Sequence, residues 1–134
     1  MLVSLAGAMA RQPPAILIVD DNVDLAENLA ELLEEDGYKT MAMTDPKAVL
    51  SKVKELDFDA AILDIRMPEV DGVDVLAELK KWFPQARFVM MTAHAADPRI
   101  ELARSLGINA LLYKPIPFDE LFEQLPQVGD NGKA

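Results

Sequence analysis

The stretch AILIVDDN at residues 15–22 sets an apolar run of strand length directly before three polar side chains. Five consecutive apolar residues predict a strand that is buried on both faces, as in a parallel sheet. Asp20, Asp21 and Asn22 are residue types that favour turns and helix caps, so a helix is expected to follow at once. The segment therefore predicts a strand, a turn and a helix, with two carboxylates at the carboxyl end of the strand.

An amphipathic helix is expected directly after this strand. Leucines recur at i, i+4, i+7 and i+8 and glutamates occupy the opposite face, which is typical of a helix with one buried side. Gly37 predicts the end of the helix, because glycine commonly terminates helices. The leucines are Leu25, Leu29, Leu32 and Leu33, and the glutamates of the solvent-exposed face are Glu27, Glu31, Glu34 and Glu35.

The alternation of strand and helix repeats four more times along the chain. Further strands are expected at residues 38–43, 58–63, 87–91 and 109–113. Further helices are expected after Asp45-Pro46, from the loop 64–71 to Pro84, from Asp97-Pro98 to Gly107, and at residues 118–125. Their expected inward-facing residues are Val49, Leu50, Val53, Leu56, Val75, Leu76, Leu79, Phe83, Ile100, Leu102, Ala103, Leu106, Phe118, Leu121, Phe122 and Leu125. The expected strands also carry methionines interpreted as core filling, namely Met41, Met43, Met90 and Met91.

Five strands that alternate with five helices predict an α/β fold, (βα)5, with a doubly wound five-stranded parallel sheet covered by helices on both faces. Residues 15–126 are expected to form this one domain. Residues 1–14 are expected to be a flexible leader, and residues 127–134 a flexible tail. Because no linker or second domain is visible, any output module is expected to lie outside this chain.

Composition narrows the classes of protein. Of the 134 residues, 51% are apolar, which is enough to close one hydrophobic core. Acidic residues number 23 and basic residues 13, and the net charge of −10 argues against nucleic acid or an anionic membrane as a direct partner. The absence of cysteine excludes thiolate zinc sites, and the single histidine, His94, excludes a histidine-rich metal cluster. The apolar run at residues 2–10 is too short to span a bilayer, and a cytoplasmic location is expected.

Polar side chains follow four of the expected strands. In an open parallel sheet, the loops after the carboxyl ends of the strands converge on one edge. These side chains are therefore expected to share a single rim: Asp20 and Asp21 after the first strand, Asp64 after the third, Thr92 after the fourth and Lys114 after the fifth.

Three carboxylates on one rim repel one another, by about 4 kcal/mol per pair at a separation of about 4 Å. A cation is therefore expected among them, and oxygen-only ligands favour Mg²⁺. A carboxylate beside such an ion can act as a nucleophile toward phosphorus. A lysine and a hydroxyl nearby would stabilise phosphoryl oxygens. The rim thus predicts a site that accepts a phosphoryl group.

Four segments together resemble the signature of response regulator receiver domains, the CheY-like family of two-component signalling. They are IVDDN at residues 18–22, LDIRMPEVDG at 63–72, MTA at 91–93 and YKP at 113–115. The resemblance covers about residues 15–125, in the order and spacing of the family. It implies a flavodoxin-like sheet with the strand order 2-1-3-4-5.

The resemblance implies that Asp64 is the phosphoacceptor. The phosphoryl group would come from a sensor histidine kinase or a histidine phosphotransfer protein. Mg²⁺ would be held by Asp20, Asp21, Asp64 and the backbone carbonyl of Arg66. The domain would assist its own phosphorylation and dephosphorylation without being an enzyme of independent turnover.

The resemblance also implies which groups bind the phosphoryl oxygens. These are the Thr92 hydroxyl, which would move toward the phosphoryl group, the backbone amide of Ala93, and Lys114. A cis peptide bond is implied at Lys114-Pro115, and Gly72 fits the turn into the third helix. The surface of the fourth helix, fifth strand and fifth helix would then change its binding to a downstream protein target or output domain, with a homodimer as a further option.

Three positions depart from the family or fall where its side chains vary. Leu111 stands where members usually carry an aromatic ring or histidine, so the usual coupling of that ring to Thr92 is not expected here. Arg66 and His94 occupy positions that tune loss of the phosphoryl group. Because both are bulky, slow self-hydrolysis is expected.

Other functions remain open. A phosphorylation-independent, receiver-like adaptor is the first alternative, and Leu111 favours it. An aspartate-nucleophile phosphatase would need an acid two residues after the nucleophile, where this chain has Arg66. A flavodoxin would need a glycine-rich and hydroxyl-rich phosphate loop after the first strand, which the sequence lacks.

Overall fold

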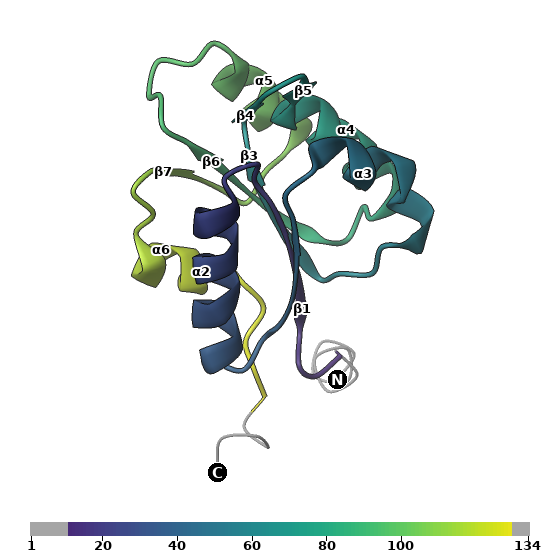
Figure 1. Ribbon diagram of the computed structural model, residues 1–134, viewed down its shortest axis with the longest axis vertical. Coiled ribbons are helices and arrows are strands. Elements are labelled where there is room, and N and C mark those ends of the chain that lie inside the picture. The colour runs from purple at the N-terminus through teal and green to yellow at the C-terminus, as the bar shows by residue number, and fades with distance from the viewer. Residues whose placement is uncertain (1–10, 130–134) are drawn as a thin grey trace.

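The computed structural model describes residues 11–129 (Figure 1). Five parallel strands form one sheet in the order β2-β1-β3-β6-β7. The sheet confirms the expected 2-1-3-4-5 order, since β6 and β7 are the fourth and fifth strands of the sheet along the chain. Its strands are β1 (Ala15–Val19), β2 (Lys39–Met43), β3 (Ala60–Asp64), β6 (Arg87–Thr92) and β7 (Ala110–Tyr113).

Helices cover both faces of the sheet, so the fold is doubly wound (Figure 1). On one face lie α2 (Val23–Glu35) and α6 (Phe118–Glu123). On the other lie α3 (Pro46–Ser51), the 3-10 turn η1 (Val53–Glu55), α4 (Gly72–Trp82) and α5 (Arg99–Leu106). No helix among residues 11–129 is both long enough and apolar enough to cross a bilayer.

The central strands are buried because each faces a helical layer on both sides. Along β1, Ile16 and Ile18 pack toward α2, whereas Leu17 and Val19 pack toward α4. This alternation follows from the two-residue period of a strand, and it explains why the whole of β1 is apolar.

Local polar groups set where the helices begin. Asn22 caps α2, with its side chain accepting a hydrogen bond from the Leu25 amide at 3.1 Å. Asp45 caps α3 in the same way, and Asp71 caps α4. These caps fix the start of each helix just beyond the carboxyl end of the preceding strand.

Several residues expected in the core are exposed. Met41 is 49% exposed and lies on β2, an edge strand of the sheet. Leu50 is 38% exposed, because the buried side of α3 is formed by Pro46 and Val49. The chain then tightens into η1 after Ser51 instead of continuing one helix to Leu56. Leu32, Leu102 and Phe118, at 36%, 41% and 39%, lie at the margins of their helices' buried stripes.

Two features of the loops were not predicted. The segment 64–71, expected to be a loop, contains a short antiparallel hairpin of β4 (Arg66–Met67) and β5 (Val70–Asp71). In addition, α5 has Pro98 rather than Asp97 at its N-cap. Asp97 still accepts a hydrogen bond from the Arg99 amide at 2.9 Å.

Both chain ends lie partly outside the described residues, so the proposed leader and tail boundaries stay predictions. In the described part, Gly129 donates from its amide to the Gln12 side chain at 2.6 Å. The Arg11 guanidinium pairs with Asp57 and Asp59. Residues 1–10 and 130–134 are not described.

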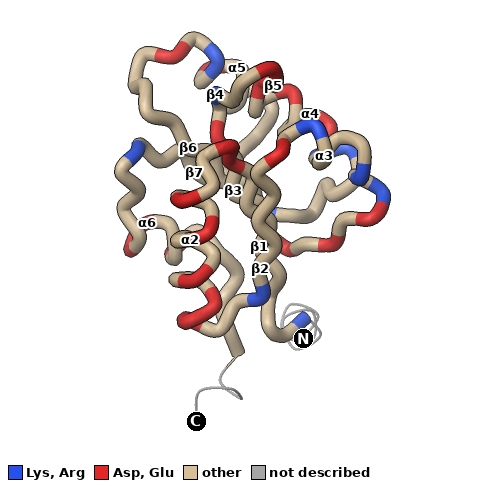
Figure 2. The backbone as a smooth tube through the Cα atoms, in the orientation of Figure 1, with Lys and Arg blue, Asp and Glu red and all other residues tan. Residues whose placement is uncertain are grey.

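Acidic positions dominate one helix. Figure 2 shows acidic positions along α2, whose sequence contains Glu27, Glu31, Glu34 and Glu35. This agrees with a solvent-exposed face opposite the buried Leu29 and Leu33.

Candidate functional site

The carboxyl ends of four neighbouring strands bring polar side chains together. Because β1 pairs with β3, β3 with β6, and β6 with β7, the residues that follow these strands lie at one edge of the sheet. The Lys114 ammonium lies between two carboxylates, 2.9 Å from Asp20 Oδ2 and 3.2 Å from Asp64 Oδ2. Groups 94 and 50 residues apart in the chain thus meet in one ionic cluster.

Backbone hydrogen bonds fix the two buried carboxylates. The Asn22 amide donates to Asp20 Oδ1 at 2.9 Å. Likewise, the Arg66 amide donates a long hydrogen bond of 3.4 Å to Asp64 Oδ1. Next to Asp64, the Ile65 amide donates to the Met91 carbonyl at 2.9 Å and so joins the loop after β3 to β6. Each carboxylate is therefore oriented by the backbone amide two residues after it.

Burial and charge determine the ionisation of this cluster. Asp20 is fully buried and Asp64 is only 5% exposed. Burial, and then the neighbouring charge of Asp20, raise the pKa of Asp64 above its usual value, although Lys114 opposes them. Burial lowers the pKa of Lys114, but Asp20 and Asp64 outweigh it, so this pKa is raised overall. Lys114 therefore stays charged. Its single positive charge does not balance the negative charges of Asp20, Asp21 and Asp64.

The donor set fits a divalent cation. Asp20, Asp21 and Asp64 each offer a carboxylate oxygen, and these oxygens lie within 4.8 Å of one another. Three carboxylates and one ammonium carry −3 + 1 = −2, which a divalent cation would neutralise. Oxygen ligands are those that Mg²⁺ prefers in proteins. The residues present are thus consistent with divalent metal binding.

Thr92 lies at the same edge but bonds within its own loop. It is 1% exposed, and its hydroxyl accepts from the His94 amide at 3.0 Å and lies 3.3 Å from the His94 carbonyl. The Thr92 carbonyl accepts from the Lys114 amide at 2.8 Å, which ties the end of β6 to the end of β7. Ala93 is exposed in the same loop.

Two further predicted positions lie on β7 and directly after it. Leu111 on β7 is half-buried and packs against the core beneath α4 and α5. The peptide bond between Lys114 and Pro115 is cis.

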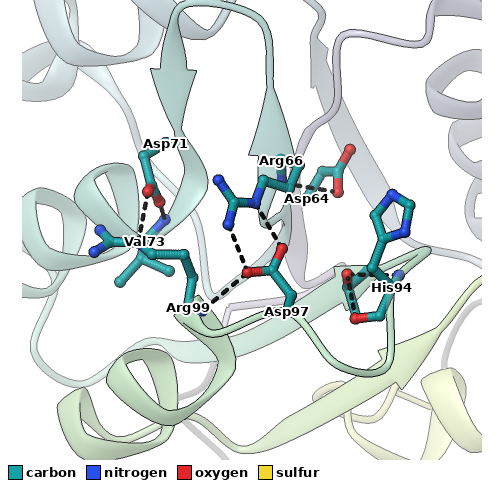
Figure 3. Close-up of polar contacts among 8 residues, drawn as sticks. Asp64, Arg66, Asp71, Val73, His94, Asp97 and Arg99 are labelled. Atoms are coloured by element: carbon teal, nitrogen blue, oxygen red, sulfur yellow. Dashed lines mark hydrogen bonds and ion pairs between the residues drawn. The ribbon is translucent and has the colours of Figure 1, made fainter.

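The Arg66 side chain bonds to a residue that sequence reasoning assigned only to a helix cap. Its guanidinium forms two hydrogen bonds with Asp97, and Figure 3 shows it directed away from the Asp64 carboxylate. Asp97 is 8% exposed as a residue, which is unusual for a loop aspartate. No sequence signal links these residues, because 31 positions separate them.

Gly72 belongs to the site for a reason other than the one predicted. Its φ is not positive, so the turn does not require glycine. Instead, a Cβ at this position would lie 1.8 Å from the Asp64 carbonyl oxygen. Only a hydrogen atom fits between the start of α4 and the backbone of the candidate phosphoacceptor.

A doubly wound parallel sheet with an acidic cluster and a lysine at its carboxyl edge defines a CheY-like receiver fold. The family model described as response regulator receiver domain matches residues 16–126. The chain belongs to this family and is a receiver domain of the response regulators of two-component systems.

The chain is also similar in sequence to known response regulators. The chain is 38% identical over 107 residues to a response regulator receiver protein of Anaeromyxobacter sp. (strain Fw109-5), covering 80% of this chain and 45% of that protein. It is 35% identical over 114 residues to the transcriptional regulatory protein ZraR of Klebsiella oxytoca, covering 84% of this chain and 26% of ZraR.

A solved structure is also similar. Response regulator protein TrrA from Thermotoga maritima, crystallised in complex with Mg²⁺-BeF, superposes with a TM-score of 0.72 and is 33% identical. The match covers 82% of this chain and 94% of that one. By contrast, the chain spans less than half the length of the two curated relatives.

Proposed function

We propose that this chain is a phosphorylation-dependent switch whose phosphoacceptor is Asp64. The phosphoryl donor is a phosphohistidine on a sensor histidine kinase or a histidine phosphotransfer protein. The observation that carries the proposal is the Lys114 ammonium, held 2.9 Å from Asp20 and 3.2 Å from Asp64 at the carboxyl edge of the sheet. It places a fixed positive charge beside a buried, oriented carboxylate.

This geometry supports the following transfer reaction. An Asp64 carboxylate oxygen attacks phosphorus and forms the new P–O bond, while the P–N bond to the donor imidazole breaks. The electron pair of that bond stays on the imidazole nitrogen, which takes up a proton. Lys114 balances negative charge on the transferring oxygens, and the backbone bond from Arg66 orients the carboxylate.

Asp20, Asp21, Asp64 and the backbone carbonyl of Arg66 are the proposed ligands of Mg²⁺. When bound, Mg²⁺ would supply the positive charge that this acidic cluster lacks. The Mg²⁺-BeF complex of TrrA supports this choice of metal.

The switch would act through Thr92 and one surface of the domain. Thr92 would exchange its bonds to His94 for a phosphoryl oxygen, with the Ala93 amide and Lys114 binding the others. The affected surface comprises α5, β7 and α6, where Leu102, Tyr113 and Phe118 are 41%, 43% and 39% exposed. These apolar side chains suit a protein partner. Because Leu111 lacks a ring, the coupling of Thr92 to this surface differs from the family's usual route.

The remaining proposals concern context. The partners are the phosphodonor and a downstream protein target or output domain, with self-association through the same surface as a second possibility. The domain binds neither nucleic acid nor membrane directly, acts in the cytoplasm, and turns over no substrate of its own. The ZraR likeness supports an output in transcription.

The direct test is phosphorylation by acetyl phosphate. With Mg²⁺ present, we expect intact mass to show one added phosphoryl group on the wild type and none on Asp64→Asn, which lacks the nucleophilic oxygen. Chelation with EDTA should suppress the reaction. A mutant that is labelled as well as the wild type would show that Asp64 is not the acceptor. An unlabelled wild type would favour the phosphorylation-independent adaptor instead.

Magnesium affinity tests the proposed ligands. We expect Asp21→Asn to weaken Mg²⁺ binding at least about tenfold in isothermal titration calorimetry, because one anionic ligand is lost. Asp21 is the most accessible of the three carboxylates and takes no part in the Lys114 bridge, so the fold should be little affected. Asp24→Asn, on the exposed first turn of α2, is the matched control and should bind as the wild type does.

A further inference from the structure

An ion pair joins the two segments that follow the proposed phosphoacceptor Asp64 on β3 and Thr92 on β6. The Arg66 guanidinium donates from Nε to Asp97 Oδ2 at 2.6 Å and from Nη2 to Asp97 Oδ1 at 2.8 Å (Figure 3). Arg66 follows β3, whereas Asp97 lies in the loop after β6. Two parallel bonds from one guanidinium form the geometry that arginine makes best with a carboxylate.

The two partners differ in burial. The Asp97 side chain is only 2% exposed, whereas that of Arg66 is 53% exposed. Asp97 also accepts from the Arg99 amide at 2.9 Å, so the start of α5 holds its carboxylate in place. Asp97 is therefore the fixed partner, and its carboxylate holds the more exposed Arg66 side chain in place.

Both segments that the ion pair joins also contact the candidate site. On one side, the Arg66 amide approaches Asp64 Oδ1 at 3.4 Å. On the other, the loop that ends at Asp97 contains His94, whose backbone bonds to the Thr92 hydroxyl. The guanidinium itself is directed toward Asp97 and away from the Asp64 carboxylate (Figure 3).

We propose that Asp97 is a positioning residue that withholds the Arg66 guanidinium from Asp64 and thereby shortens the lifetime of the phosphoryl group. This role rests on the proposed function of Asp64. An arginine without a carboxylate partner is a strong ligand for phosphoryl oxygens, and Arg66 is only two residues from the acceptor. Bound to the phosphoryl group, it would shield phosphorus from water.

The reaction that the pair controls is hydrolysis. A water oxygen attacks phosphorus, the P–O bond to Asp64 breaks, and its electron pair returns to the carboxylate. Inorganic phosphate leaves with the oxygen and both protons of that water, as H2PO4−, which then exchanges protons with solvent. The expectation that a bulky Arg66 slows self-hydrolysis stays a prediction. On this proposal, Arg66 slows hydrolysis only when Asp97 does not hold its guanidinium.

The test is a double-mutant cycle on the phosphoryl lifetime. Each protein is phosphorylated with acetyl phosphate and Mg²⁺ and desalted, and loss of the group is followed by intact mass. We expect Asp97→Asn to lengthen the lifetime about tenfold, and to have no effect when Arg66→Ala is also present. If the lifetime of Asp97→Asn equals that of the wild type, or changes equally in both backgrounds, the proposal is overturned.

Controls separate this role from a structural one. Glu101→Gln removes an exposed ion pair of 3.2 Å to Arg104 on α5 and should leave the lifetime unchanged. Should Asp97→Asn not fold, NMR of the wild type decides: the Arg66 Nε resonance should keep its chemical shift when beryllofluoride is added, and a large shift would contradict the proposal. A wild type that takes up no phosphate overturns the proposed function itself, whereas normal uptake with unchanged lifetimes overturns only the role of Asp97.

Discussion

Gly72→Ala is expected to destabilise the domain by about 3 kcal/mol and to abolish phosphorylation of Asp64. The added Cβ would lie 1.8 Å from the Asp64 carbonyl oxygen, 2.8 Å from its carbonyl carbon and 2.9 Å from the Ile65 Cα. All three are backbone atoms, so no side chain can move aside. The start of α4 and the end of β3 must separate, and the Gly72 amide would lose its 2.8 Å bond to the Ile65 carbonyl.

Two measurements check this result. Urea unfolding should give a lower midpoint with an unchanged slope, and intact mass after acetyl phosphate treatment should show no added group. Gly107→Ala is the matched control: its φ is 90°, but a Cβ there would meet only the Lys80 ammonium at 3.6 Å. It should cost about 1 kcal/mol through backbone strain and leave phosphorylation intact. Wild-type stability and labelling in Gly72→Ala would contradict the steric argument.

The central strands of the sheet were predictable because their apolar residues serve only to fill the hydrophobic core. Strands β1 and β3 are covered on both faces, so apolar runs of strand length identify them. The edge strand β2 was found at nearly its observed bounds, yet Met41 was wrongly placed in the core. An apolar residue on an edge strand gives no sign of whether a helix will cover it. The same holds for Leu50, which lies beside the buried Val49 on α3 but is itself exposed.

The cluster of the candidate site was predictable for a topological reason. Once the sheet is known to be parallel, every residue directly after a strand lies at one edge, and Asp20, Asp64 and Lys114 meet there. The Arg66 and Asp97 pair was not predictable, because Arg66 lies in the short hairpin after β3 and Asp97 in the loop after β6, and the paths of both segments depend on tertiary packing. Gly72 can be identified from the sequence as a turn residue, but its close contact with the Asp64 backbone depends on the tertiary fold.

Lys114→Met is expected to have opposite effects on stability and metal binding. In the absence of Mg²⁺, it should lower the free energy of unfolding by about 3 kcal/mol, because Asp20 and Asp64 lose their shared counterion while remaining buried. Mg²⁺ should bind about tenfold more tightly, since it no longer competes with an ammonium for the charge of these carboxylates. Phosphorylation should nevertheless slow about a hundredfold, because Lys114 is the proposed ligand of a transferring oxygen.

Chemical unfolding with and without Mg²⁺ separates these contributions. A ligand that binds only the folded state adds stability according to its affinity. Saturating Mg²⁺ should therefore reduce the difference in the free energy of unfolding between Lys114→Met and the wild type. Lys52→Met, which removes an exposed lysine after α3, controls for the change in net charge and should alter none of the three quantities. If Lys114→Met bound Mg²⁺ no more tightly than the wild type, the metal and the lysine would not share the same carboxylates. The proposed ligand set of Asp20 and Asp64 would then be wrong, even if Asp64 remained the phosphoacceptor.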